Sequence, residues 1–261
     1  MRRLVHILVF VLLAAVTGCT GAHVKYGPIG PASTFKPVVI KGNMVVIETM
    51  KKFLYDYETA TADDTLTVGE TVNIVFDSGE TALKTANVWD KVITRGNRTL
   101  GQIYQICRLT METGLRMGSL WDKTLFTPDT PHSHFGNTLA RMVATTVINL
   151  LGERQVTVSD VVNFPVDVTK FILVELKLWD KPATKSTTVG EMFELAETTL
   201  NLSLITFKIE DLVLIIIKEP LTVTPDDLDG DGVANDEDTC LFVPGNICPE
   251  EATLPRAVVG I

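Results

Sequence analysis

Near the end of the chain, acidic residues recur at alternate positions in the segment DLDGDGVANDEDTC, residues 227–240. Gly232 stands at position 6 of this segment, where a calcium-binding loop must turn sharply. Oxygen ligands are available at positions 1, 3, 5, 9 and 12 and from the main-chain carbonyl at position 7: Asp227, Asp229, Asp231, Asn235, Asp238 and Val233. Because Ca2+ prefers oxygen ligands that converge in this way, the spacing predicts a Ca2+ site, with an unstructured acidic tail as the alternative.

The flanks of this loop distinguish between two kinds of calcium motif. An EF-hand needs a helix on each side, whereas EPLTVTP precedes the loop and CLFVPG follows it. The pattern Asp-X-Asp-X-Asp-Gly-X-X-Asn-X-X-Asp-X-Cys resembles a thrombospondin type 3 repeat, with Leu241 in place of the usual proline. In tandem arrays of that family neighbouring repeats complete one another's ion shells. A single copy therefore implies weak binding, in the extracellular range of about 10⁻⁴ to 10⁻³ M.

The first 18 residues have the composition of an export signal. Two arginines precede an apolar run over residues 4–16, which is too short for a membrane-spanning helix. The sequence Val-Thr-Gly-Cys that ends at Cys19 resembles the lipobox of bacterial lipoproteins. The resemblance implies a lipid on the Cys19 sulfur, and Thr20 in the next position implies an outer-membrane lipoprotein, facing either the periplasm or the cell surface. The alternative is ordinary cleavage near Ala15, with Cys19 unmodified.

Export to an oxidising compartment bears on the remaining cysteines. Cys240 and Cys248 enclose a short segment with a Pro-Gly turn, so we expect a disulfide between them. Cys107 lies at helical spacing from Ile103 and Tyr104, which favours a buried, inert thiol over a nucleophile.

One string could support acid-base catalysis: IVFDSGE, residues 74–80. It resembles the active-site signature of aspartic proteases, in which two carboxylates share a proton, and the resemblance implies a catalytic Asp77. Glu80 departs from the small residue usual in that family, and no second Asp-Ser/Thr-Gly string occurs, so such an enzyme would have to dimerise. The alternative is a helix start, with Asp77 as the cap and Glu80 three residues later.

A second string, TPDTPHSHFGN, could hold a metal ion through Asp129, His132 and His134. Two histidines separated by one residue can share a metal when the segment is extended. No further histidine pair is available, so we favour a polar loop that links two helices.

Charge is concentrated in the tail. The formal net charge is −9, and nine acidic residues with no Lys or Arg fall between residues 226 and 251. The rest of the mature chain is close to neutral, which disfavours nucleic-acid binding and points to a cation as the counterpart of the tail.

Periodicity predicts the elements that position these residues. We expect helices over 44–60 with Asn43 as cap, over 80–93, 100–117 and 138–151, and from the capping box Thr188–Glu191 to about 199. We expect strands over 71–77 and 168–179, and one or two strands over 202–220 with a turn at 210–211. We expect no internal repeat.

Together these features predict a helix-rich α+β single domain with a small sheet, followed by a calcium loop. The expected divisions are a signal peptide (1–18), a tether (19–37), the α+β domain (38–220) and the calcium-binding tail (221–261). We expect a lipid-anchored, non-enzymatic binding or scaffold module for another envelope protein or a cell-wall component. The alternative is a lipid-anchored hydrolase that uses Asp77 or the His132/His134 segment.

Overall fold

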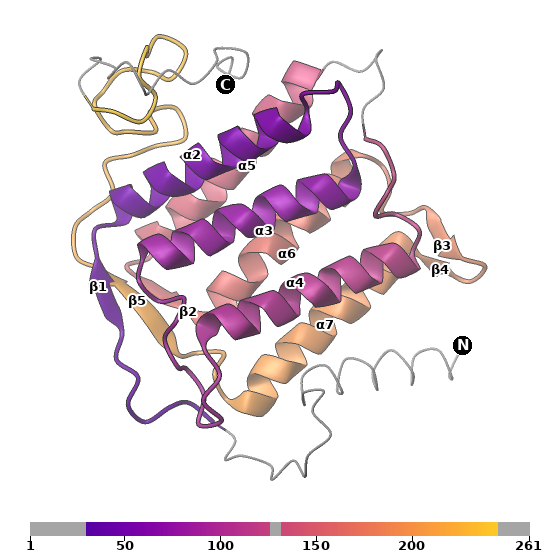
Figure 1. Cartoon of the computed structure of the whole chain (residues 1–261), viewed down its shortest axis with the longest axis horizontal. Helices are drawn as coiled ribbons and strands as arrows, with labels where there is room; N and C mark the ends of the chain where they lie inside the picture. The colour runs from indigo at the N-terminus through magenta and orange to yellow at the C-terminus, as the bar shows by residue number, and fades with distance from the viewer. Residues whose placement is uncertain (1–29, 126–131, 245–261) are drawn as a thin grey trace.

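The structure, a computed structural model, describes residues 30–125 and 132–244. These residues form a helix-rich α+β domain, which confirms the predicted fold class (Figure 1). The helices are α2 (Gly42–Ala60), α3 (Val68–Thr85), α4 (Leu100–Met117), α5 (His132–Gly152), α6 (Val158–Glu175) and α7 (Val189–Phe207). The strands are β1 (Val38–Ile40), β2 (Gln155–Thr157), β3 (Pro182–Thr184), β4 (Thr187–Thr188) and β5 (Val213–Ile217).

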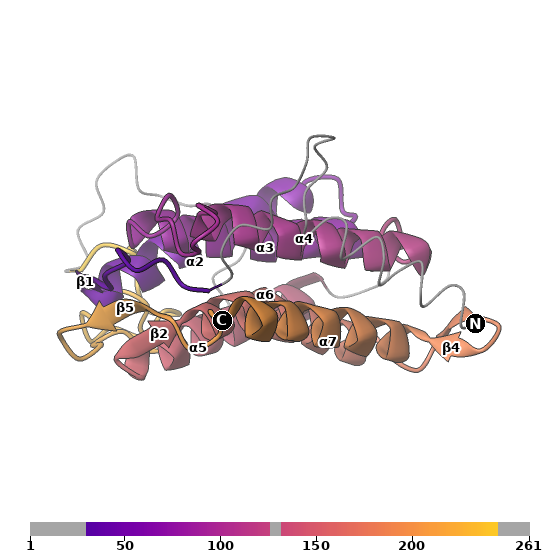
Figure 2. The ribbon, with the colours of Figure 1, turned by 90° about the horizontal axis from the view of Figure 1, so that it is seen from below.

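The helices form two layers, with α2, α3 and α4 in one and α5, α6 and α7 in the other (Figure 2). Across the layers, α2 packs on α5, α3 on α6 and α4 on α7. A three-stranded sheet of order β1-β5-β2, in which β5 is parallel to β1 and antiparallel to β2, lies at one end of the layers. Large side chains such as Phe53, Phe76 and Ile172 are fully buried in the core.

Four helices share the same start and the same end. Each start is a capping box, in which a threonine side chain and the acidic or amide side chain three residues later bond each other's backbone N–H: Thr67/Glu70, Thr99/Gln102, Thr157/Asp160 and Thr188/Glu191. Each end is a Schellman turn with one left-handed residue: Asn87, Ser119, Lys177 and Lys208. The common caps explain why α3, α4, α6 and α7 have nearly equal lengths.

The helix ends pair with the helix starts. The carbonyl oxygen of Trp89, after α3, accepts a hydrogen bond of 2.8 Å from the backbone N–H of Gly101 at the start of α4. The carbonyl of Trp121, after α4, accepts in turn from Gly69 at the start of α3. In α6 and α7, the same bonds join Trp179 to Gly190 and Glu210 to Ser159. Each pair of helices is therefore an αα-hairpin whose two helices cap each other at both ends.

The two hairpins are copies of one unit, so the expectation that the chain has no internal repeat is wrong. Residues 67–91 align with residues 157–181 without a gap, and the second helices align from Thr99 and Thr188. Identical residues occupy the aligned positions Thr67/Thr157, Val68/Val158, Val72/Val162, Asn73/Asn163, Asp77/Asp167, Leu83/Leu173, Trp89/Trp179, Asp90/Asp180 and Lys91/Lys181. The repeated unit is the hairpin, and the two units stack as the two layers.

The strands predicted over 71–77 and 168–179 are wrong, because the first segment lies within α3 and the second comprises the end of α6 and the turn that follows it. Helix α3 packs against α2, α4 and α6, and Val72, Ile74, Val75 and Phe76 are buried, whereas Asn73 and Asp77 are half-buried and contact Arg108 of α4. Within the short segment 71–77, Val72, Ile74 and Phe76 also stand at alternate positions, which is the pattern of a strand. The apolar residues of α6 read as an alternating strand for the same reason.

Other boundaries shift by local chemistry. Helix α2 begins at Gly42, so Asn43 does not cap it. The helix over 100–117 is confirmed, whereas the one predicted over 80–93 is the second half of α3 and stops at Thr85, before the left-handed Asn87. Helix α7 continues to Phe207, so of the one or two strands predicted over 202–220 the structure has one, β5.

Candidate metal centre

The tail that follows β5 packs on the domain. Figure 1 shows it running past the start of α2. The side chains of Asn43 and Thr222 share a hydrogen bond of 2.7 Å, and the backbone N–H of Thr222 donates to Asn43 Oδ1 at 3.1 Å. Arg141 of α5 forms an ion pair of 2.8 Å with Asp226. Leu221, Val223, Leu228, Leu241 and Phe242 join the hydrophobic core. The acidic loop is therefore held against α2 and α5.

The structure brings three of the predicted ligands together. Asp227, Asp229 and Asp231 each present one carboxylate oxygen, and these oxygens lie within 4.8 Å of one another. Both oxygens of Asp227 accept backbone hydrogen bonds, from Gly230 at 2.8 Å and from Gly232 at 3.0 Å. The two glycines have φ of +75° and +91°, a conformation that a residue with a Cβ adopts only under strain. The glycines thus fold the backbone so that alternate carboxylates converge.

Asp229 is the residue of this loop that a bound cation would stabilise most. Its side chain is only 5% exposed, and its Oδ1 accepts from the backbone N–H of Asp231 at 3.2 Å. Its Oδ2 is buried without a hydrogen-bond partner in the described part of the chain. Burial raises the pKa of Asp229, and the nearby charges of Asp231, Asp238 and Asp227 raise it further. An unpaired buried carboxylate oxygen beside other carboxylates is unfavourable unless a positive ion binds there.

The remaining predicted ligands have other contacts. Asn235 is buried and holds the loop closed, because its Oδ1 accepts from the backbone of Leu228 at 3.0 Å and its Nδ2 donates to the carbonyl of Pro225 at 2.9 Å. Asp238 lies outside the cluster of three, and its Oδ1 accepts from the backbone of Cys240 at 2.7 Å. The backbone N–H of Val233 donates to Asp231 Oδ1 at 2.8 Å. Asn235 thus has a structural role that its position in the motif does not reveal.

The cysteines divide between the described and undescribed parts of the chain. Cys240 is buried, whereas its predicted partner Cys248 and the predicted lipidation site Cys19 lie outside the described residues. Cys107 is a free, buried cysteine, as expected, and burial raises the pKa of its thiol to about 12. A thiol with this pKa is a poor nucleophile.

Asp77 lies in the middle of α3, so the prediction that it caps a helix is wrong. Its carboxylate pairs with Arg108 of α4 at 2.6 Å, and the same guanidinium donates to Asn73 at 2.8 Å. The hydroxyl of the neighbouring Ser78 is buried and donates to the carbonyl of Ile74. Asp77 therefore joins two helices within one hairpin.

The histidine segment differs from the geometry that a two-histidine metal site requires. Helix α5 begins at His132, so the backbone there is helical, whereas the predicted site required an extended segment. Asp129 lies outside the described residues.

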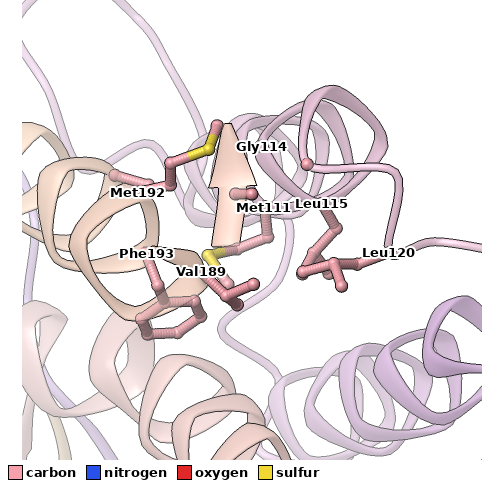
Figure 3. Close-up of a pocket in the computed structure, with 10 residues that line it drawn as sticks. Met111, Gly114, Leu115, Leu120, Val189, Met192 and Phe193 are labelled. Atoms are coloured by element: carbon pink, nitrogen blue, oxygen red, sulfur yellow. The ribbon is translucent and has the colours of Figure 1, made fainter. Parts of the chain in front are cut away.

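An apolar pocket lies between α4 and α7, beside the β3–β4 hairpin (Figure 3). Its lining includes Met111, Leu115, Met192 and Phe193, with Gly114 at its edge, and none of the ten lining side chains is titratable. The cavity volume is about 20 Å³, close to that of one water-sized sphere. No sequence motif marks this pocket, because its lining comes from α4 and α7, which are far apart in the sequence and meet only in the folded domain.

A second pocket lies farther along the same pair of helices. The two pockets contain equivalent residues of the repeats: Met111 and Gly114 in the first correspond to Leu200 and Ser203 in the second. The second pocket also has polar side chains in its lining, among them Arg98, Thr110 and Thr199, and neither pocket has the size of a substrate site.

No protein family, curated protein or solved structure matches this chain. Among the helices of the described residues, none is both long enough and apolar enough to cross a membrane. The acidic loop is the place where the chain's own residues best specify a ligand, because it combines converging carboxylates with an unpartnered buried oxygen.

Proposed function

We propose that this chain is a lipid-anchored bacterial envelope protein whose C-terminal tail binds Ca2+ and whose helical domain is a binding or scaffold module. The observation that carries the calcium proposal is the Asp229 Oδ2, which is buried, has no hydrogen-bond partner among the described residues, and lies next to carboxylates of Asp227 and Asp231. Ca2+ fits this donor set better than a transition metal, because all the ligands are hard oxygens and no cysteine or histidine belongs to the cluster.

The ion would act as a clasp. Without it, three carboxylates repel one another in a loop that is held to α2 and α5 by few polar contacts, among them the Arg141–Asp226 pair. Ca2+ neutralises that repulsion and stabilises the loop, and with it the packing of Leu228 and Phe242 on the core. Because the ion binds only the folded state, calcium raises the stability of the tail with the logarithm of the ratio of calcium concentration to the dissociation constant, once that ratio is well above one.

A binding or scaffold role, with an envelope protein or cell-wall component as partner, suits what surrounds the loop. Asp77 forms an ion pair with Arg108, and the thiol of Cys107 is buried with a raised pKa. The two pockets between α4 and α7 have little volume, and the first has no titratable side chain in its lining. The acidic tail has no Lys or Arg between residues 226 and 251, which disfavours binding to nucleic acid.

The test is calorimetric titration of the mature chain with Ca2+ and, separately, with Mg2+. We expect Ca2+ to bind in the range of about 10⁻⁴ to 10⁻³ M and Mg2+ to bind more weakly, because Mg2+ demands octahedral geometry and holds its waters. Equal binding of both ions, or none, would contradict the calcium proposal. Mass spectrometry of the chain from a bacterial envelope tests the anchor, which requires lipid on Cys19.

A further inference from the structure

The outer edge of α4 and α7 exposes an unusual concentration of apolar side chains. Of the nine large hydrophobic side chains that the described residues expose, four belong to these two helices, at exposed fractions of 44–60%. They are Leu109 and Met117 on α4 and Leu202 and Ile205 on α7, and we call them the α4–α7 edge. The second half of α7, residues 198–207, contains no charged residue. Figure 2 shows α4 lying over α7 at one side of the two layers.

The beginning of the described chain is fixed at the loop that precedes α4. The backbone N–H of Arg95 donates to the carbonyl of Gly30 at 2.9 Å, and the N–H of Ala32 donates to Ile93 at 3.0 Å. Pro31 also forms a bridge with Thr94. The chain therefore enters the domain beside the first turn of α4.

The length of chain before this point limits the distance to the anchor. Cys19 precedes Gly30 by 11 residues, which span at most about 40 Å when extended. Leu109 lies about 15 Å along α4 from its first turn. If Cys19 carries lipid, the bilayer surface is within reach of the α4–α7 edge.

The loop at which the chain enters is basic. Lys91, Arg95 and Arg98 occur within eight residues and outnumber the one acidic residue beside them, the exposed Asp90. Exposed apolar side chains bordered by Lys and Arg favour the interface of a bilayer with anionic headgroups. A second copy of the chain fits less well, because four partly exposed side chains offer on the order of 400 Å², below the roughly 800 Å² per partner of a stable interface.

We propose that the α4–α7 edge rests on an anionic phospholipid surface, the same membrane to which Cys19 is anchored. This inference rests on the lipid anchor of the proposed function. The two attachments reinforce each other, because the anchor holds the edge at a high effective concentration next to the bilayer and a weak contact then suffices to orient the domain. The lipid class is set by the basic loop, which attracts negatively charged headgroups.

The test uses the mature chain with Cys19→Ser, which removes the lipid so that the edge is measured alone. Binding is measured by flotation with phosphatidylcholine vesicles, with and without phosphatidylglycerol. We expect binding to vesicles that contain phosphatidylglycerol, and weaker binding at high salt because salt screens the basic loop. We expect the double substitution Leu202→Ser/Ile205→Ser to lower the partition coefficient at least about tenfold, because two half-exposed side chains no longer enter the interface.

Met44→Ser is the control, because Met44 is 53% exposed and belongs to α2, which lies on the other side of α3 from α4 (Figure 1). It should leave the partition coefficient unchanged, and circular dichroism checks that each variant is folded. The proposal is overturned if the parent chain does not bind vesicles, if the double substitution binds as the parent does, or if the double substitution instead abolishes a dimer seen by sedimentation. Failure of the anchor itself is read separately, as absence of lipid on Cys19 in the native chain.

Discussion

Substitution of Asp229 by Asn removes one negative charge from the acidic loop and should change stability in opposite directions with and without calcium. In the presence of a chelator, the wild-type loop keeps a buried carboxylate oxygen without a partner near Asp227 and Asp231. Neutralising that carboxylate should raise the free energy of unfolding by on the order of 1 kcal/mol, because an unsatisfied buried charged group is unfavourable by at least this amount.

With calcium the sign reverses. For a dissociation constant of about 10⁻⁴ M, Ca2+ at about 10 mM stabilises the wild-type fold by about 2.7 kcal/mol. If loss of one carboxylate ligand weakens binding roughly a hundredfold, the stabilisation falls to about 0.4 kcal/mol. Since 1 kcal/mol shifts the melting temperature of a domain of this size by about 2–4 °C, calcium should raise the melting temperature by about 5–10 °C in the wild type and by about 1 °C in Asp229→Asn.

Scanning calorimetry in calcium and in chelator measures both differences on the same samples. Asp236→Asn is the matched control, because it makes the same change of charge at an exposed position in the same loop, outside the predicted ligand set. It should keep most of the calcium-dependent shift. The reasoning fails if both variants lose the shift equally, or if Asp229→Asn melts with the same calcium dependence as the wild type.

Three further predictions concern stability, reactivity and pH. Gly101→Ala should lower the free energy of unfolding by about 1–3 kcal/mol, because a Cβ there would lie 2.5 Å from the Trp89 ring. Gly114→Ala in the same helix should raise the free energy of unfolding by about 0.5–1 kcal/mol, because a Cβ there enters open space. Urea denaturation of both variants measures the difference. Cys107 should not react with a thiol reagent at pH 8 in the native protein, because a pKa of about 12 leaves on the order of one thiol in 10⁴ ionised. The thiol should react once the protein is unfolded. Rapid labelling of the native chain would contradict this prediction. Because the pKa of Asp229 is raised above 3.8, its contribution to the stability of the calcium-free fold should be greatest below that pH and be lost as pH rises through the raised pKa. Calcium affinity should change the other way, falling as acidification protonates this ligand, and calorimetric titrations at several pH values measure it.

The candidate site could be predicted further than the fold could. The positions of Asp227, Asp229 and Asp231 follow from a local rule, since a short loop with glycine at fixed places determines where its own carboxylates point. The role of Asn235 could not be predicted, because its partners, Leu228 and Pro225, are backbone groups that any residue provides. Its assignment as a ligand came from spacing alone.

Helices whose pattern was followed over their whole length were easier to predict than helices judged from a short segment. The helix over 100–117 was predicted with its observed bounds, because α4 lies at an outer edge and keeps a polar face. Helix α3 also has a polar face, which includes Asn73, Asp77 and Glu80, but the short segment 71–77 places Val72, Ile74 and Phe76 at alternate positions and so resembles a strand. The capping box of Thr67 and Glu70 marked its true start, but a strand was predicted across the following residues.

The repeat was missed because its most informative residues lie in loops. Trp89 and Trp179 each occur in the string Trp-Asp-Lys, after a left-handed residue and before a threonine cap. Each string taken alone resembles an ordinary turn. The repeat is recognised only from the structure, in which each tryptophan packs over the glycine that starts the partner helix. The fourth loop hides the pattern further, because Glu210 replaces the tryptophan where the chain continues into β5.

The two halves of the domain are equivalent in architecture but are used differently. Figure 1 places α2 and α5 on one side of the central helices α3 and α6, and α4 and α7 on the other. The acidic tail packs on the first side, through Asn43 and Arg141, whereas the apolar edge and the point of chain entry belong to the second side. If the α4–α7 edge faces the bilayer, the calcium loop faces away from it. In that orientation the calcium loop is accessible both to free calcium and to a partner in the envelope. Contact of the α4–α7 edge with lipid would then hold the calcium loop in this accessible position.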